Sequence, residues 1–367
     1  MASDLEQAQA LQRAGQTRDA LLRCRELLAR EPERVDAWLL AGSLSFKLHE
    51  LADAAEAFRR ALQLAPEAAP LHRNLGTVLR AQGQLEAALS CFQRAAELRR
   101  DWSKPLQGLA TTAMELGRWQ AAVTACHTWL SLDRANVEAL GLLSIALDEL
   151  GESNAADVLL DFERLFRQIT LSAPPPGFAS VSAFNAALTR QVLEHPTLRA
   201  VPPGDPRYHC PTLRQTEEFC AEPTGPSAAL RNLVASAIDG YITKLQRALP
   251  DHPFVAGAAR RFTLKSWATV LDGEGNLEPH VHYGSYVSAV YYPKIPSQMA
   301  AERHGDGGLE FGGGPARFPC RVKRPARTIE PHEGLLVLFP SYFYHRTAPF
   351  QAAEPRIAIA FDSVALG

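Results

Sequence analysis

The sequence predicts a multidomain protein: an N-terminal all-α solenoid of helical hairpins, followed by a C-terminal jelly-roll domain with flanking helices. Three observations predict this fold class. Small, glycine and bulky residues recur every 34 residues in the first part of the chain, a run of prolines ends that recurrence, and short strands bounded by Gly and Pro follow. The 367 residues suffice for two or three domains.

The first part of the chain is built on an internal repeat. Three series share the 34-residue period: Ala20, Ala54, Ala88, Ala122 and Ala156; Gly15, His49, Gly83, Gly117 and Gly151; Cys24, Phe58, Phe92, Cys126 and Leu160. The alanines allow two helices to approach closely, the glycines provide the turn between them, and the large residues fill the seam between units. Only His49 departs from the glycine series.

Residues 4–165 resemble tetratricopeptide repeats, each of which is a 34-residue helix-turn-helix. The resemblance implies four to five repeats in a solenoid domain over residues 1–170. It also implies a groove that binds a peptide or a protein, because solenoids mostly serve as binding surfaces. The alternative is a spacer or a dimerisation module.

Prolines Pro174, Pro175 and Pro176 mark the predicted linker, residues 171–178, because consecutive prolines cannot continue a helix. We expect the second domain to span residues 179–367. Helical periodicity within it predicts helices over residues 181–194 and 227–248, with a loop and at most one strand over 200–226.

Five β-rich runs follow, in which alternating, β-branched and aromatic residues predict strands. They cover residues 262–271, 286–292, 308–311, 335–339 and 356–361, and we expect Pro293 and Pro340 to end the second and fourth. Short strands punctuated by Gly and Pro indicate a sandwich or a jelly roll.

Composition excludes several classes of function. Lys and Arg number 38 against 40 Asp and Glu, and this near-balance argues against a nucleic-acid partner. The sequence shows neither an apolar run of about 20 residues for a membrane span nor a secretory signal. Six widely spaced cysteines without a CxxC pair indicate a reduced, cytoplasmic protein.

A histidine cluster is the main candidate for chemistry. His280 and His282 enter the strand 286–292 at positions i and i+2, so in an extended chain both imidazoles point to the same side. His345 follows the strand 335–339, and Arg356 begins the last strand. Imidazoles that converge in this way can chelate a first-row metal.

The combination of segments is similar to a bacterial family of 2-oxoglutarate/iron(II) oxygenases, which have a double-stranded β-helix fold. The similarity covers about residues 262–364 and rests on Ser266-Trp267, the Pro-His-Val-His element 279–282, and the runs 288–293, 308–311, 334–340 and 356–361. It implies a dioxygenase of the hydroxylase type that uses Fe(II), 2-oxoglutarate and O2. It also implies that His280 and His345 bind iron and that Arg356 pairs with the distal carboxylate of 2-oxoglutarate, which a planar guanidinium suits.

Two departures from the family pattern matter. At His282 the superfamily pattern has Asp or Glu, so His280, His282 and His345 would form a three-histidine site that zinc also accepts. Glu278 remains a competing third ligand, although we favour His282. The second departure is Ala358, where many relatives have a serine that holds the co-substrate. That task would fall to Lys265, Ser288, Thr347 or a tyrosine.

Three functions follow from these observations. The favoured one is an oxygenase that hydroxylates a peptide or protein presented by the repeats. The second is a repeat scaffold with an inactive jelly roll, and the third is a three-histidine metal protein that does not use 2-oxoglutarate. The basic stretch 317–327 is either a solvated loop or edge strand, or a grip for an acidic partner near the site.

Overall fold

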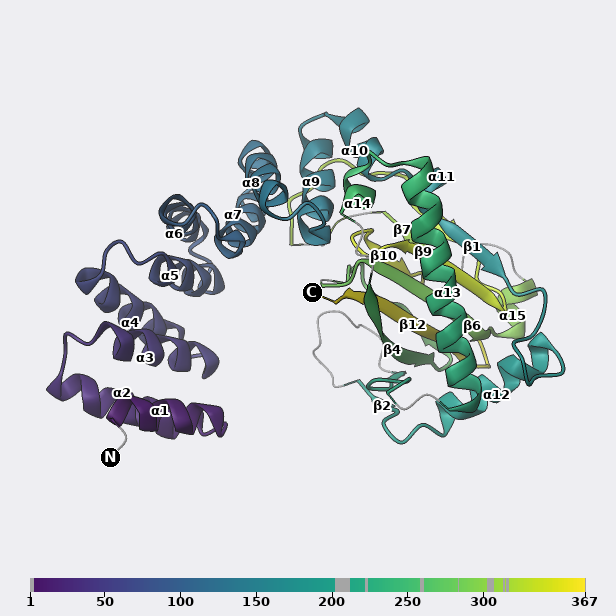
Figure 1. Ribbon diagram of the computed structural model, residues 1–367, viewed down its shortest axis with the longest axis horizontal. Coiled ribbons are helices and arrows are strands. Elements are labelled where there is room, and N and C mark those ends of the chain that lie inside the picture. Colours follow the sequence, from purple (N-terminus) through teal and green to yellow (C-terminus); the bar gives the residue numbers. More distant parts are fainter. Residues whose placement is uncertain are drawn as a thin grey trace. The chain divides into compact units, whose positions relative to one another are not determined.

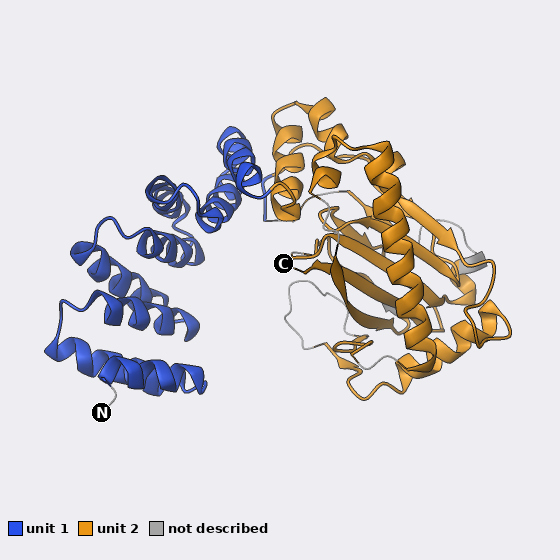
Figure 2. Cartoon of the chain, viewed as in Figure 1, with its two compact units in different colours: residues 1–133, 317–319 blue, residues 134–316, 320–367 orange. Residues whose placement is uncertain are grey.

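The computed structural model describes residues 3–201, 212–221, 224–257, 261–282, 284–301, 307–312, 314 and 317–366. The chain forms two compact units (Figure 2). Unit 1 comprises residues 1–133 with 317–319, and unit 2 comprises residues 134–316 with 320–367.

Unit 1 is a series of helical hairpins. Its helices are α1 (Asp4–Arg13), α2 (Thr17–Arg30), α3 (Val35–Lys47), α4 (Leu51–Leu64), α5 (Ala69–Ala81), α6 (Leu85–Leu98), α7 (Ser103–Glu115) and α8 (Trp119–Leu132). The repeat alanines of the second helices are fully buried, so neighbouring helices approach closely there. Phe58 and Phe92 lie against Gly42 and Gly76, where even one added carbon atom would crowd the ring.

The turn residues of the repeat have the backbone conformation that glycine favours. All of the series Gly15, Gly83, Gly117 and Gly151 have positive φ, and His49 adopts the same conformation with φ of 61°. The predicted helix-turn-helix repeat is therefore confirmed, and His49 replaces glycine without changing the turn.

Unit 2 begins with the helices α9 (Val137–Glu149), α10 (Ser153–Leu159) and α11 (Phe162–Leu165), and its longest helix is α13 (Gly225–Ala248). The shorter helices are α12 (Val181–Leu193), α14 (Pro253–Ala256) and α15 (Ser297–Ala301). The large sheet has the order β1 (Arg167–Thr170), β9 (Leu335–Pro340), β6 (Val287–Lys294), β12 (Arg356–Ala365), β4 (Phe262–Leu271), β3 (Leu213–Gln215), β2 (Arg199–Ala200). A three-stranded sheet has the order β10 (His345–Thr347), β7 (Leu309–Phe311), β8 (Arg327–Ile329), and β11 (Phe350–Gln351) pairs with β5 (Glu274–Gly275).

Helices cover one face of the large sheet, and α13 runs across it in Figure 1. The apolar face of α13 is buried, and Tyr241 on it donates a hydrogen bond of 2.6 Å to the backbone oxygen of Leu165. On the same face, the hydroxyl of Tyr291 in β6 donates to Asn185 of α12 at 2.6 Å. The opposite face of β6 and β12 is left for the site described below.

The antiparallel, jelly-roll-like C-terminal domain predicted from the sequence is confirmed, and so are all five predicted strands and both helices. The strand β9 ends at Pro340, as expected, whereas Pro293 does not end β6, which continues to Lys294. Pro293 lies where the register between β6 and β12 shifts, and proline is tolerated at such bulges because no ladder hydrogen bond is lost.

The compact units divide at residues 133 and 134, whereas the repeat pattern places the domain boundary at residues 171–178. The helices α9 and α10 continue the 34-residue period yet belong to unit 2 by their contacts. The boundaries at 170 and 179 stay a prediction.

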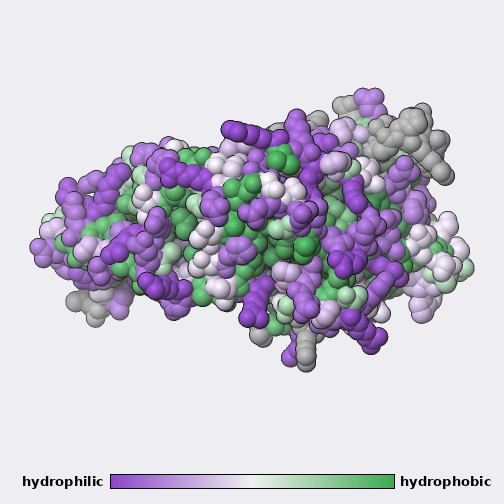
Figure 3. Space-filling model, turned by 90° about the horizontal axis from the view of Figure 1, so that it is seen from above, coloured by the Kyte–Doolittle hydropathy of each residue, from purple (hydrophilic) through white to green (hydrophobic). Residues whose placement is uncertain are grey.

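None of the helices in the described part of the chain is long and apolar enough to cross a membrane. Hydrophilic side chains, in purple, cover much of the face shown in Figure 3.

Candidate metal centre

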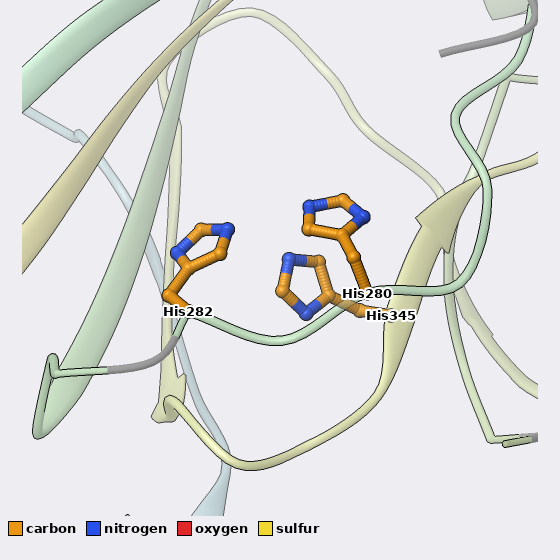
Figure 4. A group of neighbouring side chains, drawn as sticks. All are labelled: His280, His282 and His345. Carbon is orange, nitrogen blue, oxygen red and sulfur yellow. The ribbon is translucent and has the colours of Figure 1, made fainter. Parts of the chain in front are cut away.

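Three histidines meet where the segment before β6 crosses the start of β10. His280 and His345 lie directly opposite each other and exchange two backbone hydrogen bonds of 3.0 Å. His282 follows on the same side of the chain, and its backbone N–H donates to Ser341. One ring nitrogen of each histidine lies within 4.8 Å of the others, and the rings are turned toward one another (Figure 4).

The second nitrogen of each ring is already occupied. Nδ1 of His280 lies 2.8 Å from the backbone oxygen of Glu278, and Nδ1 of His345 lies 2.9 Å from that of Phe343. Nδ1 of His282 lies 2.8 Å from Oδ1 of Asp362. Because these oxygens accept hydrogen bonds, each Nδ1 carries a proton, and in a neutral ring Nε2 then keeps its lone pair. This is the tautomer that binds a metal through Nε2.

Burial holds His345 in the neutral form. Its pKa is well below the ordinary value because the ring is buried, and the neighbouring His280 and His282 lower it further. A neutral imidazole is the form that ligates a cation. The cluster offers three imidazole nitrogen donors and no carboxylate ligand among the described residues.

A buried arginine lies on the large sheet of the same domain. Arg356, at the start of β12, is 2% exposed, and its Nε donates to the backbone oxygen of Gly307 at 3.1 Å. None of the ion pairs between described residues includes it. Burial lowers the pKa of Arg356 from the ordinary value, because a buried charge is costly unless it is paired.

Tyr292 of β6 shares the surroundings of Arg356. The guanidinium carbon lies 5.1 Å from the centre of the Tyr292 ring. The hydroxyl of Tyr292 is buried without a hydrogen-bond partner among the described residues. A buried hydroxyl without a hydrogen-bond partner, next to a buried guanidinium without an ion-pair partner among the described residues, offers donors to an anion.

Every second side chain of β12 lies on its inner face, in the order Arg356, Ala358, Ala360 and Asp362. The last of these, Asp362, accepts the hydrogen bond of His282. Ala358 lies opposite Thr269 of β4, whose side chain is buried. Together with Tyr292 on the other side, Thr269 offers a hydroxyl next to the position where the family has serine.

The other predicted site residues lie in different places. The carboxylate of Glu278 accepts a hydrogen bond of 3.3 Å from Asn276, and it is not part of the histidine cluster. Ser288 is buried beneath His282, with its hydroxyl 3.1 Å from Nδ1. Thr347 is buried two residues after His345, and Lys265 of β4 is exposed opposite Asp362.

Two residues of this site, Asp362 and Tyr292, were not singled out from the sequence. Asp362 has a detectable signal, because it stands six positions after Arg356 and an even spacing in a strand places both on one face. Tyr292 has none, because Tyr291 and Tyr292 are both buried and their order does not reveal which faces the site.

The basic stretch meets acidic groups of its own chain. Arg324 forms two hydrogen bonds with the carboxylate of Asp148 in α9, and its Nη1 lies 2.5 Å from Asp157 in α10. The backbone amides of Arg321 and Val322 donate to Glu149, each at 2.8 Å. These contacts hold the segment before β8 against α9 and α10.

Comparisons with known families agree with both halves of this description. The family described as "Putative 2OG-Fe(II) oxygenase" matches residues 265–362. Tetratricopeptide-repeat families match residues 5–69 and 45–111. The resemblances drawn from the sequence are therefore confirmed. No curated protein sequence matches the chain.

Three solved structures that are similar to part of the chain each cover less than half of it. The MamA protein (residues 41 to the end) from Desulfovibrio magneticus RS-1 is 17% identical, with 45% of this chain and 97% of that chain covered and a TM-score of 0.40. YrrB, described as a TPR protein with an unusual peptide-binding site, is 22% identical. The match covers 43% of this chain and 81% of YrrB, with a TM-score of 0.41. A mutant O-GlcNAc transferase from Thermobaculum terrenum is 30% identical. The match covers 36% of this chain and 26% of the transferase chain, with a TM-score of 0.33.

Proposed function

We propose that this chain, which joins tetratricopeptide repeats to a 2OG-Fe(II) oxygenase domain, is a 2-oxoglutarate- and Fe(II)-dependent dioxygenase that hydroxylates a peptide or a protein. The observation that carries the proposal is the pairing of two features in one domain. Three Nε2 atoms face one another with their Nδ1–H groups already engaged, and a buried arginine has no ion-pair partner among the described residues.

The donor set fits a divalent first-row metal. Imidazole nitrogen is a ligand for iron as well as for zinc, copper and nickel. His280, His282 and His345 would hold the ion through Nε2, because each Nδ1 donates to a fixed oxygen that sets the ring orientation.

The surroundings of Arg356 fit a dicarboxylate co-substrate. The guanidinium would pair with the distal carboxylate of 2-oxoglutarate, and the unpartnered hydroxyl of Tyr292 would donate a second hydrogen bond to it. Thr269, opposite Ala358, provides a further hydroxyl on the other side. Ser288 already bonds to Asp362 and thus belongs to the support of His282 rather than to the co-substrate.

The metal with 2-oxoglutarate would supply the activation of O2. In the overall reaction, substrate R–H, O2 and 2-oxoglutarate give R–OH, succinate and CO2, with one oxygen atom in the alcohol and one in succinate. The residues of this chain contribute orientation: Arg356 and Tyr292 hold the co-substrate at its far end, and the histidines hold the metal. Phe311 and Phe339, with ring centres 5.9 and 4.9 Å from that of His345, exclude water behind it.

The repeats provide the argument for the class of substrate. Tetratricopeptide solenoids present stacked helices that bind extended peptides or protein surfaces. A chain that carries such an array beside an oxygenase domain would bind its substrate there and act on one of its side chains. A location in the cytoplasm suits this function and the described cysteines, which form no disulfide bond.

Succinate formation tests the proposal. The purified chain, supplied with Fe(II), 2-oxoglutarate and ascorbate in air, should form succinate slowly without substrate, and a His345→Ala variant should form none above background. A wild-type protein that binds Fe(II) but forms no succinate at any 2-oxoglutarate concentration would contradict it.

One observation favours a second candidate, a three-histidine metal protein that does not use 2-oxoglutarate. The described cluster contains no carboxylate, and three histidines are a ligand set that zinc accepts readily. Preferential retention of Zn(II) during purification, with no effect of 2-oxoglutarate on thermal stability, would favour this candidate over the oxygenase.

A further inference from the structure

Asp362 is the one carboxylate that touches the histidine cluster in the described part of the chain. It lies on β12, is 9% exposed, and places Oδ1 at 2.8 Å from Nδ1 of His282. A buried carboxylate is costly unless it is paired. Among the ion pairs of described residues, its only partner is His282.

A chain of buried hydroxyl groups supports this carboxylate. Ser288 donates to Oδ1 of Asp362 at 2.8 Å, Ser341 lies 3.0 Å from Ser288, and Ser285 lies 2.9 Å from Ser341. Ser288 is the hydroxyl that donates to the carboxylate, and Ser341 and Ser285 continue the chain of hydroxyl groups away from it.

His282 differs from the other two histidines in this respect. The Nδ1 atoms of His280 and His345 face neutral backbone oxygens, whereas that of His282 faces a carboxylate. His282 is also the residue that stands where the superfamily pattern has an acidic metal ligand. The three histidine ligands contain no negative charge, and Asp362, which is hydrogen-bonded to His282, brings one next to them.

We propose that Asp362 is a positioning residue that supplies, through the His282 ring, the negative charge that an acidic ligand would otherwise bring to the metal. It orients the ring, sets its tautomer and raises its basicity as a ligand. A divalent ion with three neutral imidazoles would have a net charge of +2, and Asp362 lowers the charge of the whole group to +1. The inference rests on the metal site of the proposed function, but not on 2-oxoglutarate or on any substrate.

The test is Co(II) binding by the full-length protein, followed through the visible absorption of the bound ion. Asp362→Asn keeps the shape of the side chain and removes its charge, and we expect the dissociation constant to rise by about 10- to 100-fold. Asp272→Asn is the matched control. Asp272 directly follows β4, the neighbour of β12, and pairs with Arg214 instead of a histidine, so this variant should leave the Co(II) affinity unchanged. Asp362→Glu, which restores the charge at a longer reach, should recover part of the affinity.

The midpoint potential of the Fe(III)/Fe(II) couple distinguishes the proposed electrostatic role of Asp362 from a purely structural one. Loss of a nearby negative charge favours the less positive Fe(II) state, so the potential of Asp362→Asn should rise above that of the wild type. Far-UV circular dichroism reports whether each variant is folded. Ser288→Ala removes one hydrogen bond to the carboxylate of Asp362 but keeps its charge, so it should weaken Co(II) binding by only a few-fold.

Co(II) affinity of Asp362→Asn within twofold of the wild type, or an unchanged potential, would overturn the proposal and leave the three-histidine site intact. A wild-type protein that binds no Co(II), Fe(II) or Zn(II) would instead overturn the metal site of the proposed function, and this inference with it.

Discussion

His280 and His345 form a directly opposed backbone pair that exchanges two hydrogen bonds of 3.0 Å, although the two residues belong to different runs of the sequence. The pair joins the segment before β6 to β10, so the two rings reach the same space from opposite chain segments. Since backbone hydrogen bonds set their separation, the two rings are preorganised before any ion binds.

His345→Ala should weaken the binding of Fe(II) or Co(II) by at least about 100-fold, because removing only a supporting hydrogen-bond partner of a ligand typically costs 10- to 100-fold. His332→Ala is the control, since His332 contacts Thr170 away from the cluster. Calorimetric metal titration measures both. Equal affinities for the two variants would exclude His345 as a ligand.

Neighbouring tyrosines of β6 allow a matched comparison. Tyr292→Phe removes an unpartnered hydroxyl, so stability without ligand should be unchanged or slightly higher. The affinity for 2-oxoglutarate should fall about 10-fold or more, since hydrogen bonds to a charged group are worth about 1.5–3 kcal/mol. Tyr291→Phe removes the hydrogen bond to Asn185 on the opposite face and should lower stability while leaving this affinity unchanged.

Thermal denaturation with and without 2-oxoglutarate, in the presence of Co(II), measures both effects for the two tyrosine variants. If Tyr291→Phe rather than Tyr292→Phe loses the rise in melting temperature with 2-oxoglutarate, the assignment of Tyr292 to the inner face of the sheet is wrong.

Arg324→Ala should destabilise the protein by about 3–5 kcal/mol, because it leaves the buried carboxylate of Asp148 without its partner. Arg214→Ala is the control, since its pair with Asp272 is only half-buried and surface pairs contribute about 0–1 kcal/mol. Urea unfolding measures the two losses. Similar, small losses for both would show that the contact of Arg324 with α9 contributes little.

Stability should fall as the pH drops below about 6.5, the ordinary histidine pKa. Burial lowers the pKa of His252, whose Nε2 lies 2.8 Å from the backbone oxygen of Val158 and whose Nδ1 accepts from Phe254. The folded protein then binds fewer protons than the unfolded chain, so the contribution of His252 is complete above that pKa and is lost as the pH falls toward the folded value.

Melting temperatures of the metal-free protein between pH 7.5 and 5 measure this effect. His345 contributes in the same direction, so the prediction concerns the difference between proteins: His252→Gln should show a smaller decrease than the wild type. An equal decrease in both would show that His252 is not responsible.

The repeats and the main strands could be predicted from the sequence because their signals are local. A 34-residue period repeats the same buried alanine and the same turn, and β4 has the predicted bounds, Phe262–Leu271. The histidine cluster could be predicted because His280 and His282 share a side at i and i+2, and only His345 had to be brought in by the fold.

The roles of Asp362 and Tyr292 beside the site could not be predicted, because they depend on the register between strands. Asp362 reaches His282 only because β12 pairs with β6 so that Asp362 lies opposite Ser288. The strand β6 is buried on both faces, so its sequence lacks the alternation that would assign Tyr292 to the inner face.

The most direct test of the account is an anaerobic titration of the Fe(II)-loaded protein with 2-oxoglutarate, followed by visible absorption. Bidentate chelation of Fe(II) by the 2-oxo acid gives a charge-transfer band, so the wild type should develop a saturable band. Arg356→Met should bind Fe(II) equally well but require at least about 10-fold more 2-oxoglutarate, because a charge-assisted pair to the carboxylate is lost. Stoichiometric Fe(II) binding without any such band in the wild type, or saturation of both proteins at the same concentration, would contradict it.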